Sequence, residues 1–159
     1  MSEAKPLKRS IQLQPLSREH HDGLLFVWKI RQGLHNDASI DKLQKYVRWF
    51  WKYHIRPHFF QEEKILLPYL PANHPLGQKL KDDHNEILEL MFSIDREVER
   101  QDLISLANFI ESHIRWEERE FFQYLESNLS PAELEDVSKN LNDHPVSCEV
   151  EWKDEFWVK

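Results

Sequence analysis

Apolar residues recur every three or four positions along four long stretches of this chain, which is the spacing of one face of an α-helix. The first stretch begins near residue 16, the second near Ser39, the third covers about residues 76–100, and the fourth follows a very short connection at Gln101–Asp102. Short connections between long helices favour antiparallel neighbours. We therefore predict an all-α fold, an up-and-down antiparallel four-helix bundle.

Several residues mark where these helices should begin, bend or end. Ser17 can cap the first helix. Pro57 lies inside the second and has no N–H to donate, so we expect a kink or break there. Ser130-Pro131-Ala132-Glu133 is a capping box with proline at the first helical position, and it predicts a short fifth helix that ends near Asn142.

The chain should therefore divide into three parts. Residues 1–15, with two prolines and no clear period, are expected to form an extended lead-in. Residues 16–127 form the bundle, and residues 128–159 form the fifth helix and an aromatic tail. The tail carries Trp152, Phe156 and Trp157, which should pack either on the bundle or on a second copy, so that a homodimer through the tail is one expectation.

Composition excludes several classes of protein. Only 3 of the 159 residues are glycine, fewer than β-sandwiches or nucleotide-binding α/β folds usually need. The net charge of −7 argues against a nucleic acid or an anionic membrane surface as the partner. No apolar run is long enough to span a membrane, and the start of the chain does not resemble a signal peptide, so we expect a cytoplasmic protein. Cys148 is the single cysteine, which excludes an internal disulfide, a Cys-x-x-Cys zinc site and a four-cysteine iron–sulfur cluster.

Polar residues interrupt the apolar stripes where leucine would be expected. The second helix contains His58 and Glu62, and the fourth contains His113 and Glu117, each pair spaced as His-x-x-x-Glu. Residues four apart share one helix face. The first and third helices each add one histidine between apolar stripe positions: His20 or His21 in the first, and His84 in the third.

These interruptions belong to an internal repeat. Residues 16–20 align with 80–84, and residues 58–63 align with 113–118, so the chain resembles two copies of one helical hairpin. The repeat selects His20 over His21. Packed together, the two copies would direct four imidazoles and two carboxylates into one interior, and burying such groups without partners costs several kcal/mol per charge. A pair of divalent metal ions, with the two carboxylates free to bridge them, offsets that cost.

The donor types narrow the choice of metal. Mixed imidazole and carboxylate ligands suit iron best, with manganese or zinc possible, whereas calcium and magnesium prefer oxygen ligands alone. The chain has no Glu-x-x-His pair of the ferritin-like di-iron bundles and no His-Glu-x-x-His of the zinc proteases. The predicted ligands are His20, His58, Glu62, His84, His113 and Glu117.

Three further residues are possible additional or alternative ligands. His21 adjoins His20, His54 lies one turn before His58, and Glu118 follows Glu117. Other acidic residues, among them Asp82 and Asp83, are expected on solvated faces.

The first helix supplies a histidine, the second His-x-x-x-Glu, the third a histidine and the fourth His-x-x-x-Glu. This ordered set resembles the hemerythrin-like, or HHE cation-binding, domains over about residues 16–127. The resemblance implies a di-iron centre with oxo, hydroxo or carboxylate bridges. Two departures from the oxygen-carrying hemerythrins matter. Leu88 stands where those proteins have a second third-helix histidine, and Glu118 stands where their fourth helix has aspartate. Both departures favour the subgroup with four histidines and two glutamates.

From these residues and this resemblance we expect a non-haem di-iron protein that binds or senses O₂ or another small ligand such as NO or peroxide, or iron itself. We expect a metal- and ligand-binding protein rather than an enzyme. The alternatives are a di-iron oxidase or peroxide-consuming enzyme, and a module that handles iron or NO. The catalytic residues of such an enzyme are not predicted by the sequence.

Overall fold

The computed structural model of the protein describes residues 8–146 and 150–158, and these residues contain helices and no strand. The α-helices are α1 (Gln14–His35), α2 (Ile40–Phe50), α3 (Arg56–Gln61), α4 (Pro75–Arg96), α5 (Arg100–Trp116), α6 (Phe122–Asn128) and α7 (Pro131–Asp143). Three π-helical turns lie between them, η2 (Trp51–Ile55), η3 (Glu62–Leu66) and η5 (Glu117–Phe121), and two 3₁₀ turns are η1 (Ile11–Leu13) and η4 (Leu67–Tyr69). Cys148 lies outside the described residues.

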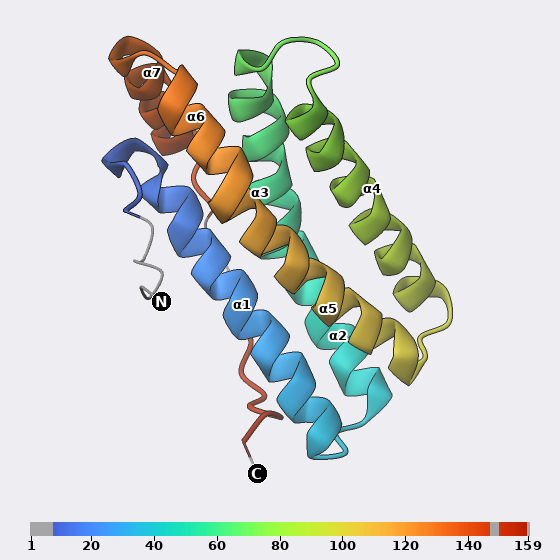
Figure 1. Ribbon diagram of the computed structural model, residues 1–159. Coiled ribbons are helices and arrows are strands. Elements are labelled where there is room, and N and C mark those ends of the chain that lie inside the picture. Colours follow the sequence, from blue (N-terminus) through green and yellow to red (C-terminus); the bar gives the residue numbers. More distant parts are fainter. Residues whose placement is uncertain (1–7, 147–149, 159) are drawn as a thin grey trace, which may run out of the picture.

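The fold is a helical bundle. In Figure 1 the long segments lie alongside one another: α1, the run from α2 to η3, α4, and the run from α5 to α6. α5 packs against both α1 and α4. None of the described helices is both long enough and apolar enough to cross a membrane.

The first helix begins earlier than we predicted. η1 starts at Ile11 and α1 at Gln14, so residues 11–15 are helical and not part of an extended lead-in. Leu13 and Leu16, three positions apart, are both fully buried, which explains why the helix extends toward the N-terminus. Ser17 does not cap the helix, because it lies within α1. Residues 1–7 of the predicted lead-in are outside the described residues.

The connection predicted at Gln101–Asp102 lies instead at residues 97–99, because Glu99 and Asp102 form a capping box that starts α5 at Arg100. Two other boundaries match the prediction. The side chain of Ser39 caps α2, and Ser130 and Glu133 form the predicted capping box of α7, which ends at Asp143. The irregularity expected at Pro57 takes the form of a π-helical turn: η2 ends at Ile55, and Pro57 lies in the first turn of α3, where its missing N–H is tolerated. The chain thus remains helical through the proline.

Two apolar clusters lie along the bundle, and the helices pass from one to the other through a polar layer. In α1, Leu16 belongs to one cluster and Phe26 to the other, and His20 lies between them in sequence. In α4, His84 lies between Leu80 and Ile87 in the same way. The bundle therefore holds its buried histidines between two apolar regions.

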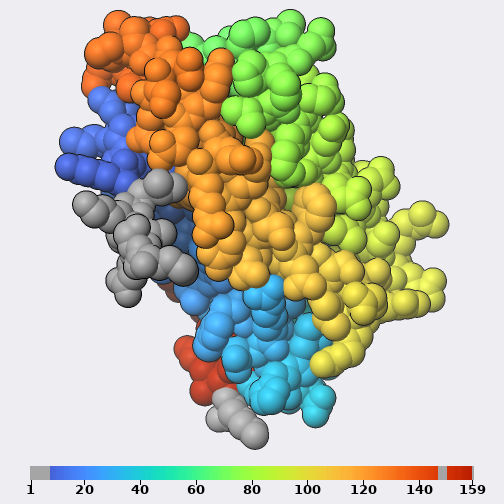
Figure 2. Space-filling view, in the orientation of Figure 1, coloured from blue at the N-terminus to red at the C-terminus, as the bar shows by residue number. Residues whose placement is uncertain are grey.

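The aromatic tail packs on the bundle of the same chain. Phe156 is 7% exposed and belongs to the cluster that contains Phe26. Its ring lies 4.9 Å from that of Tyr46, and a side chain added at Gly33 would meet it at 2.7 Å. Trp152 and Trp157 pack partly buried against the same cluster. In Figures 1 and 2 the tail, in red, runs beside α1 at one end of the molecule. A homodimer through this tail stays a prediction.

Candidate metal centre

Six buried side chains from the four long segments meet in the polar layer. They form two groups of possible metal ligands, in each of which the ligand atoms lie within 4.8 Å of one another. One group contains His20 and His58, the other contains His84 and His113, and both groups contain Glu62 and Glu117. The sharing of both carboxylates is the arrangement of a dinuclear site with two bridging ligands.

Each carboxylate divides its oxygens between the two groups. On the first side, Oε2 of Glu62 lies 3.3 Å from Nε2 of His58 and 3.8 Å from Nε2 of His20. Oε2 of Glu117 lies 3.1 Å from Nε2 of His20. On the second side, Oε1 of Glu62 lies 3.1 Å from Nε2 of His84, and Oε1 of Glu117 contacts Nε2 of His113. Each glutamate therefore offers one oxygen to each pair of imidazoles.

Both glutamates begin a π-helical turn. η3 starts at Glu62 and η5 at Glu117, each four residues after the histidine with which it pairs. The same backbone feature thus occurs at matched positions of the internal repeat. π-helical turns inside α-helices are frequent at functional sites.

The burial of these groups fits a metal. Glu62 and Glu117 are both 0% exposed. Oε2 of Glu62, both side-chain oxygens of Glu117 and Nε2 of His113 lie against other atoms of the two groups but form no hydrogen bond with a described residue. An unpaired buried polar atom costs about 1–3 kcal/mol, and a charged one costs more. Metal ions bound between the imidazoles and the carboxylates would remove that cost, so the residues present suit a metal pair.

Each of the four imidazoles has an acidic residue at its other nitrogen, Nδ1. The two short contacts are 2.6 Å from His58 to Glu19 and 2.8 Å from His113 to Asp83. Two longer contacts join His20 to Glu118 at 3.5 Å and His84 to Glu63 at 3.7 Å. A carboxylate hydrogen-bonded to Nδ1, as at His58 and His113, fixes the ring so that Nε2 faces the other predicted ligands. Nδ1 of His20 and Nδ1 of His84 form no hydrogen bond with a described residue.

These outer carboxylates follow the repeat. Glu19 and Asp83 each precede the histidine of the first helix in their half, and each contacts the histidine of the second helix. Asp83 was predicted to be solvated, which is wrong: it is 8% exposed and bonded to His113. The repeat itself contained the signal, because an acid stands at both aligned positions.

Charged neighbours shift the pKa values of the residues in these two groups. Burial alone lowers the pKa of His58, but the carboxylates of Glu62 and Glu19 outweigh burial and raise it to about 10. Burial likewise raises the pKa of Glu62, but the neighbouring histidines outweigh it and hold this pKa well below its usual range. For His20 and His113 burial prevails, and it lowers their pKa. The metal-free protein would therefore hold protons unequally among its four imidazoles.

The three alternative ligands lie outside both groups. His21 is exposed on α1. His54 is half-buried and stacks on Phe50, with ring centroids 4.6 Å apart. Glu118 accepts a hydrogen bond from Ser17 and pairs with Arg9 at 3.1 Å, with His20 on its other oxygen. The structure thus places Glu118 behind the imidazole and not between the imidazoles.

Comparison with protein families gives one match. The family model of the Hemerythrin HHE cation binding domain matches residues 12–125 of this chain. The chain belongs to the hemerythrin HHE family. A comparison with curated proteins found no match, and neither did a comparison with solved structures.

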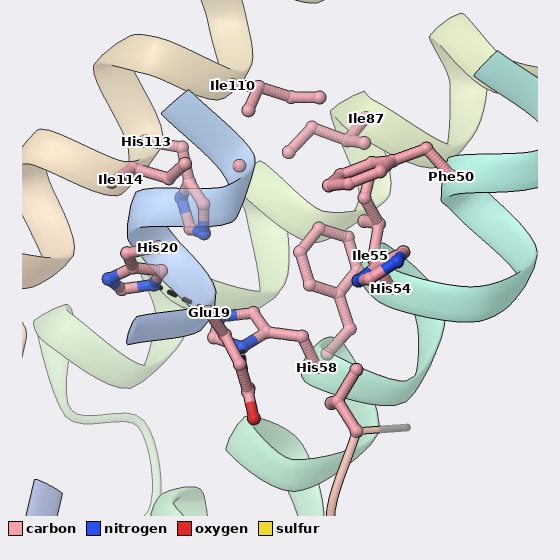
Figure 3. Close-up of a pocket in the computed structure, with 13 residues that line it drawn as sticks. Glu19, His20, Phe50, His54, Ile55, His58, Ile87, Ile110, His113 and Ile114 are labelled. Carbon is pink, nitrogen blue, oxygen red and sulfur yellow. Dashed lines mark hydrogen bonds and ion pairs between the residues drawn. The ribbon is translucent and has the colours of Figure 1, made fainter. Parts of the chain in front are cut away.

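In this hemerythrin HHE domain a small pocket adjoins the centre. It has a volume of about 40 Å³ and is lined by His20, His58 and His113 and by apolar residues such as Ile87 and Ile110. Figure 3 shows these side chains around the pocket. Gly23 also lines the pocket, and a Cβ added there would lie 2.7 Å from Cδ1 of Ile114. The pocket has room for a ligand of a few atoms.

Proposed function

We propose that this chain is a non-haem di-iron protein that binds a small ligand, O₂ or a molecule of similar size such as NO or peroxide. The observation that supports the proposal best is that two pairs of buried imidazoles share the two carboxylates of Glu62 and Glu117. We also propose that the four long segments form an up-and-down antiparallel bundle, because the connections between them are short.

The donor set favours iron. Two imidazoles and carboxylate oxygen at each position suit Fe(II), and manganese or zinc would accept the same donors. Iron held there would supply electrons to a ligand that binds beside it. The six ligands fill the polar layer, while Glu19 and Asp83 orient two of the imidazoles through Nδ1.

The pocket determines which ligand can approach. Its apolar wall offers no hydrogen bond to water, so it favours a small apolar ligand over bulk solvent. A Cβ added at Gly23 would clash with Ile114 of α5, so this glycine lets α1 and α5 pack closely beside the pocket.

The test is the metal-to-protein ratio after anaerobic loading with Fe(II), for the natural chain and for His58→Ala and His113→Ala. Two irons per chain in the natural protein and fewer in both variants would support the dinuclear site. No bound iron in a folded natural chain would overturn it. Loading with Mn(II) or Zn(II) in parallel shows which of the three metals the site retains.

Mixing the di-iron(II) protein with O₂ then distinguishes binding from catalysis. A coloured adduct that disappears when O₂ is removed supports a ligand-binding protein. Rapid irreversible oxidation with turnover of a reductant or of peroxide would instead support an oxidase or a peroxide-consuming enzyme.

A further inference from the structure

A second pocket, separate from the one at the metal centre, lies between α1, the α2–η2 segment and the C-terminal tail. We name it the outer pocket; its volume is about 200 Å³, and its aromatic lining consists of Phe26, Tyr46, Trp49, Phe50, Trp152 and Trp157. Phe50 and His54 line both the outer pocket and the pocket at the metal centre. These two side chains are therefore a wall common to both.

The walls of the outer pocket are held in place by specific contacts. Nε1 of Trp49 donates a hydrogen bond of 2.7 Å to the backbone oxygen of Val150, and the side chain of Asn36 donates one of 3.1 Å to that of Trp157. The ring of Trp152 lies 5.1 Å from that of Tyr46, edge to face. The pocket is thus built by the folded chain and needs no ligand to form.

Three polar side chains line the outer pocket in addition to Tyr46, which carries a hydroxyl. They are Asp22, Lys29 and His54. Nζ of Lys29 lies 4.0 Å from the centre of the Trp157 ring and donates no hydrogen bond to any described residue. Neither ring nitrogen of His54 forms a hydrogen bond with a described residue. The ring lies against those of Trp49 and Phe50. Lys29 can donate, Asp22 can accept and His54 can do either.

Size and chemistry together define a ligand class. An engineered apolar cavity of about 150 Å³ binds benzene, so a pocket of about 200 Å³ accommodates one aromatic ring with a substituent. Aromatic walls favour a planar ring. A hydroxyl group both donates and accepts, which matches the three polar groups. We propose that the outer pocket binds a single-ring hydroxyaromatic molecule of the phenol class.

Charge argues against an aromatic anion as the ligand. Asp22 lines the pocket together with its one lysine, Lys29, so the pocket already holds a carboxylate for this cation. The neutral phenol needs no further cation. This inference does not depend on the proposed di-iron function, because none of the six predicted ligands lines the outer pocket.

The test compares 4-fluorophenol with fluorobenzene on the full-length protein, by ¹⁹F NMR titration. We expect saturable binding of 4-fluorophenol about fivefold tighter than that of fluorobenzene, the effect of one hydrogen bond. Lys29→Met should remove most of this preference, because it keeps the length of the side chain and deletes the donor. Trp152→Ala should weaken 4-fluorophenol about tenfold, because it removes one wall.

The matched control is Trp28→Ala, which removes a tryptophan of α1 that is 48% exposed and does not line the outer pocket. It should bind 4-fluorophenol as the natural chain does. Absence of saturable binding would overturn the proposal, as would equal affinity in the natural chain, Lys29→Met and Trp152→Ala, which would place the ligand elsewhere. Should Trp152→Ala fail to fold, as judged by circular dichroism, Lys29→Met decides alone.

Discussion

Oδ2 of Asp83 lies 2.8 Å from Nδ1 of His113, on the opposite side of the imidazole from Glu117. The two residues belong to different helices, α4 and α5, which pack against each other. The packing of these helices therefore determines how the imidazole of the predicted ligand His113 is oriented. Lys79 also pairs with Asp83, at 3.1 Å, and His113 and Lys79 together outweigh burial and hold the pKa of Asp83 below its usual range. The carboxylate is thus kept charged behind the ring.

Replacing this outer carboxylate should weaken metal binding without abolishing it. We expect Asp83→Asn to lower metal affinity about 10- to 100-fold, because the amide no longer stabilises the ring in the orientation that presents Nε2. Competition with a coloured chelator measures the change. The matched control is Asp82→Asn, since Asp82 is exposed and accepts a hydrogen bond from Gln78 of the same helix. Equal losses in the two variants would contradict the role of Asp83.

The shared carboxylates predict a difference in metal stoichiometry between two kinds of variant. Glu117 belongs to both groups of possible ligands, whereas His84 belongs to one. Glu117→Ala should therefore lose both metal ions, and His84→Ala should lose mainly the ion that His84 and His113 hold. Elemental analysis of the loaded and desalted proteins measures this. If Glu117→Ala retains one ion as firmly as His84→Ala does, the bridging arrangement is wrong.

The spacing of His58 and Glu62 placed both side chains on one helix face, and the internal repeat placed His20 and His84 opposite them. This much follows from local geometry, and the structure brings all six side chains together. The repeat aligns Asp83 with Glu19, but it could not show that Asp83 lies behind His113, because that contact depends on how α4 and α5 are rotated against each other. The burial of Asp83 follows from the same packing.

Other features depend on contacts between distant segments. The early start of α1 rests on Leu13, which is buried in the same cluster as Leu141 of α7. The position of Phe156 depends on the space beside Gly33 and Leu43, more than 100 residues earlier in the chain. An apolar pattern alone identifies such residues as buried but does not say which surface covers them.

The pKa of His58 predicts how metal binding depends on pH. In the metal-free protein this pKa is raised to about 10, so the imidazole holds a proton at neutral pH that the metal must displace. Affinity should therefore rise with pH between about 7 and 10, and binding near pH 7 should release at least one proton. Calorimetric Zn(II) titration in two buffers of different ionisation enthalpy measures the protons released. In Glu19→Gln the rise of affinity should level off at a lower pH, because the variant lacks one carboxylate that raises this pKa; an unchanged pH range would contradict the assignment.

Packing of the tail on its own bundle predicts a large effect on stability. Phe156 is 7% exposed, and its ring contacts that of Tyr46 edge to face and fills the space beside Gly33. Phe156→Ala should lower the free energy of unfolding by about 3–5 kcal/mol, because it leaves a cavity in the cluster. The control is Phe92→Ala, whose ring is 54% exposed on α4 and whose loss should change stability by less than about 0.5 kcal/mol. Urea denaturation followed by circular dichroism measures both. A change of similar size in the two variants would show that the tail does not contribute to the core in solution.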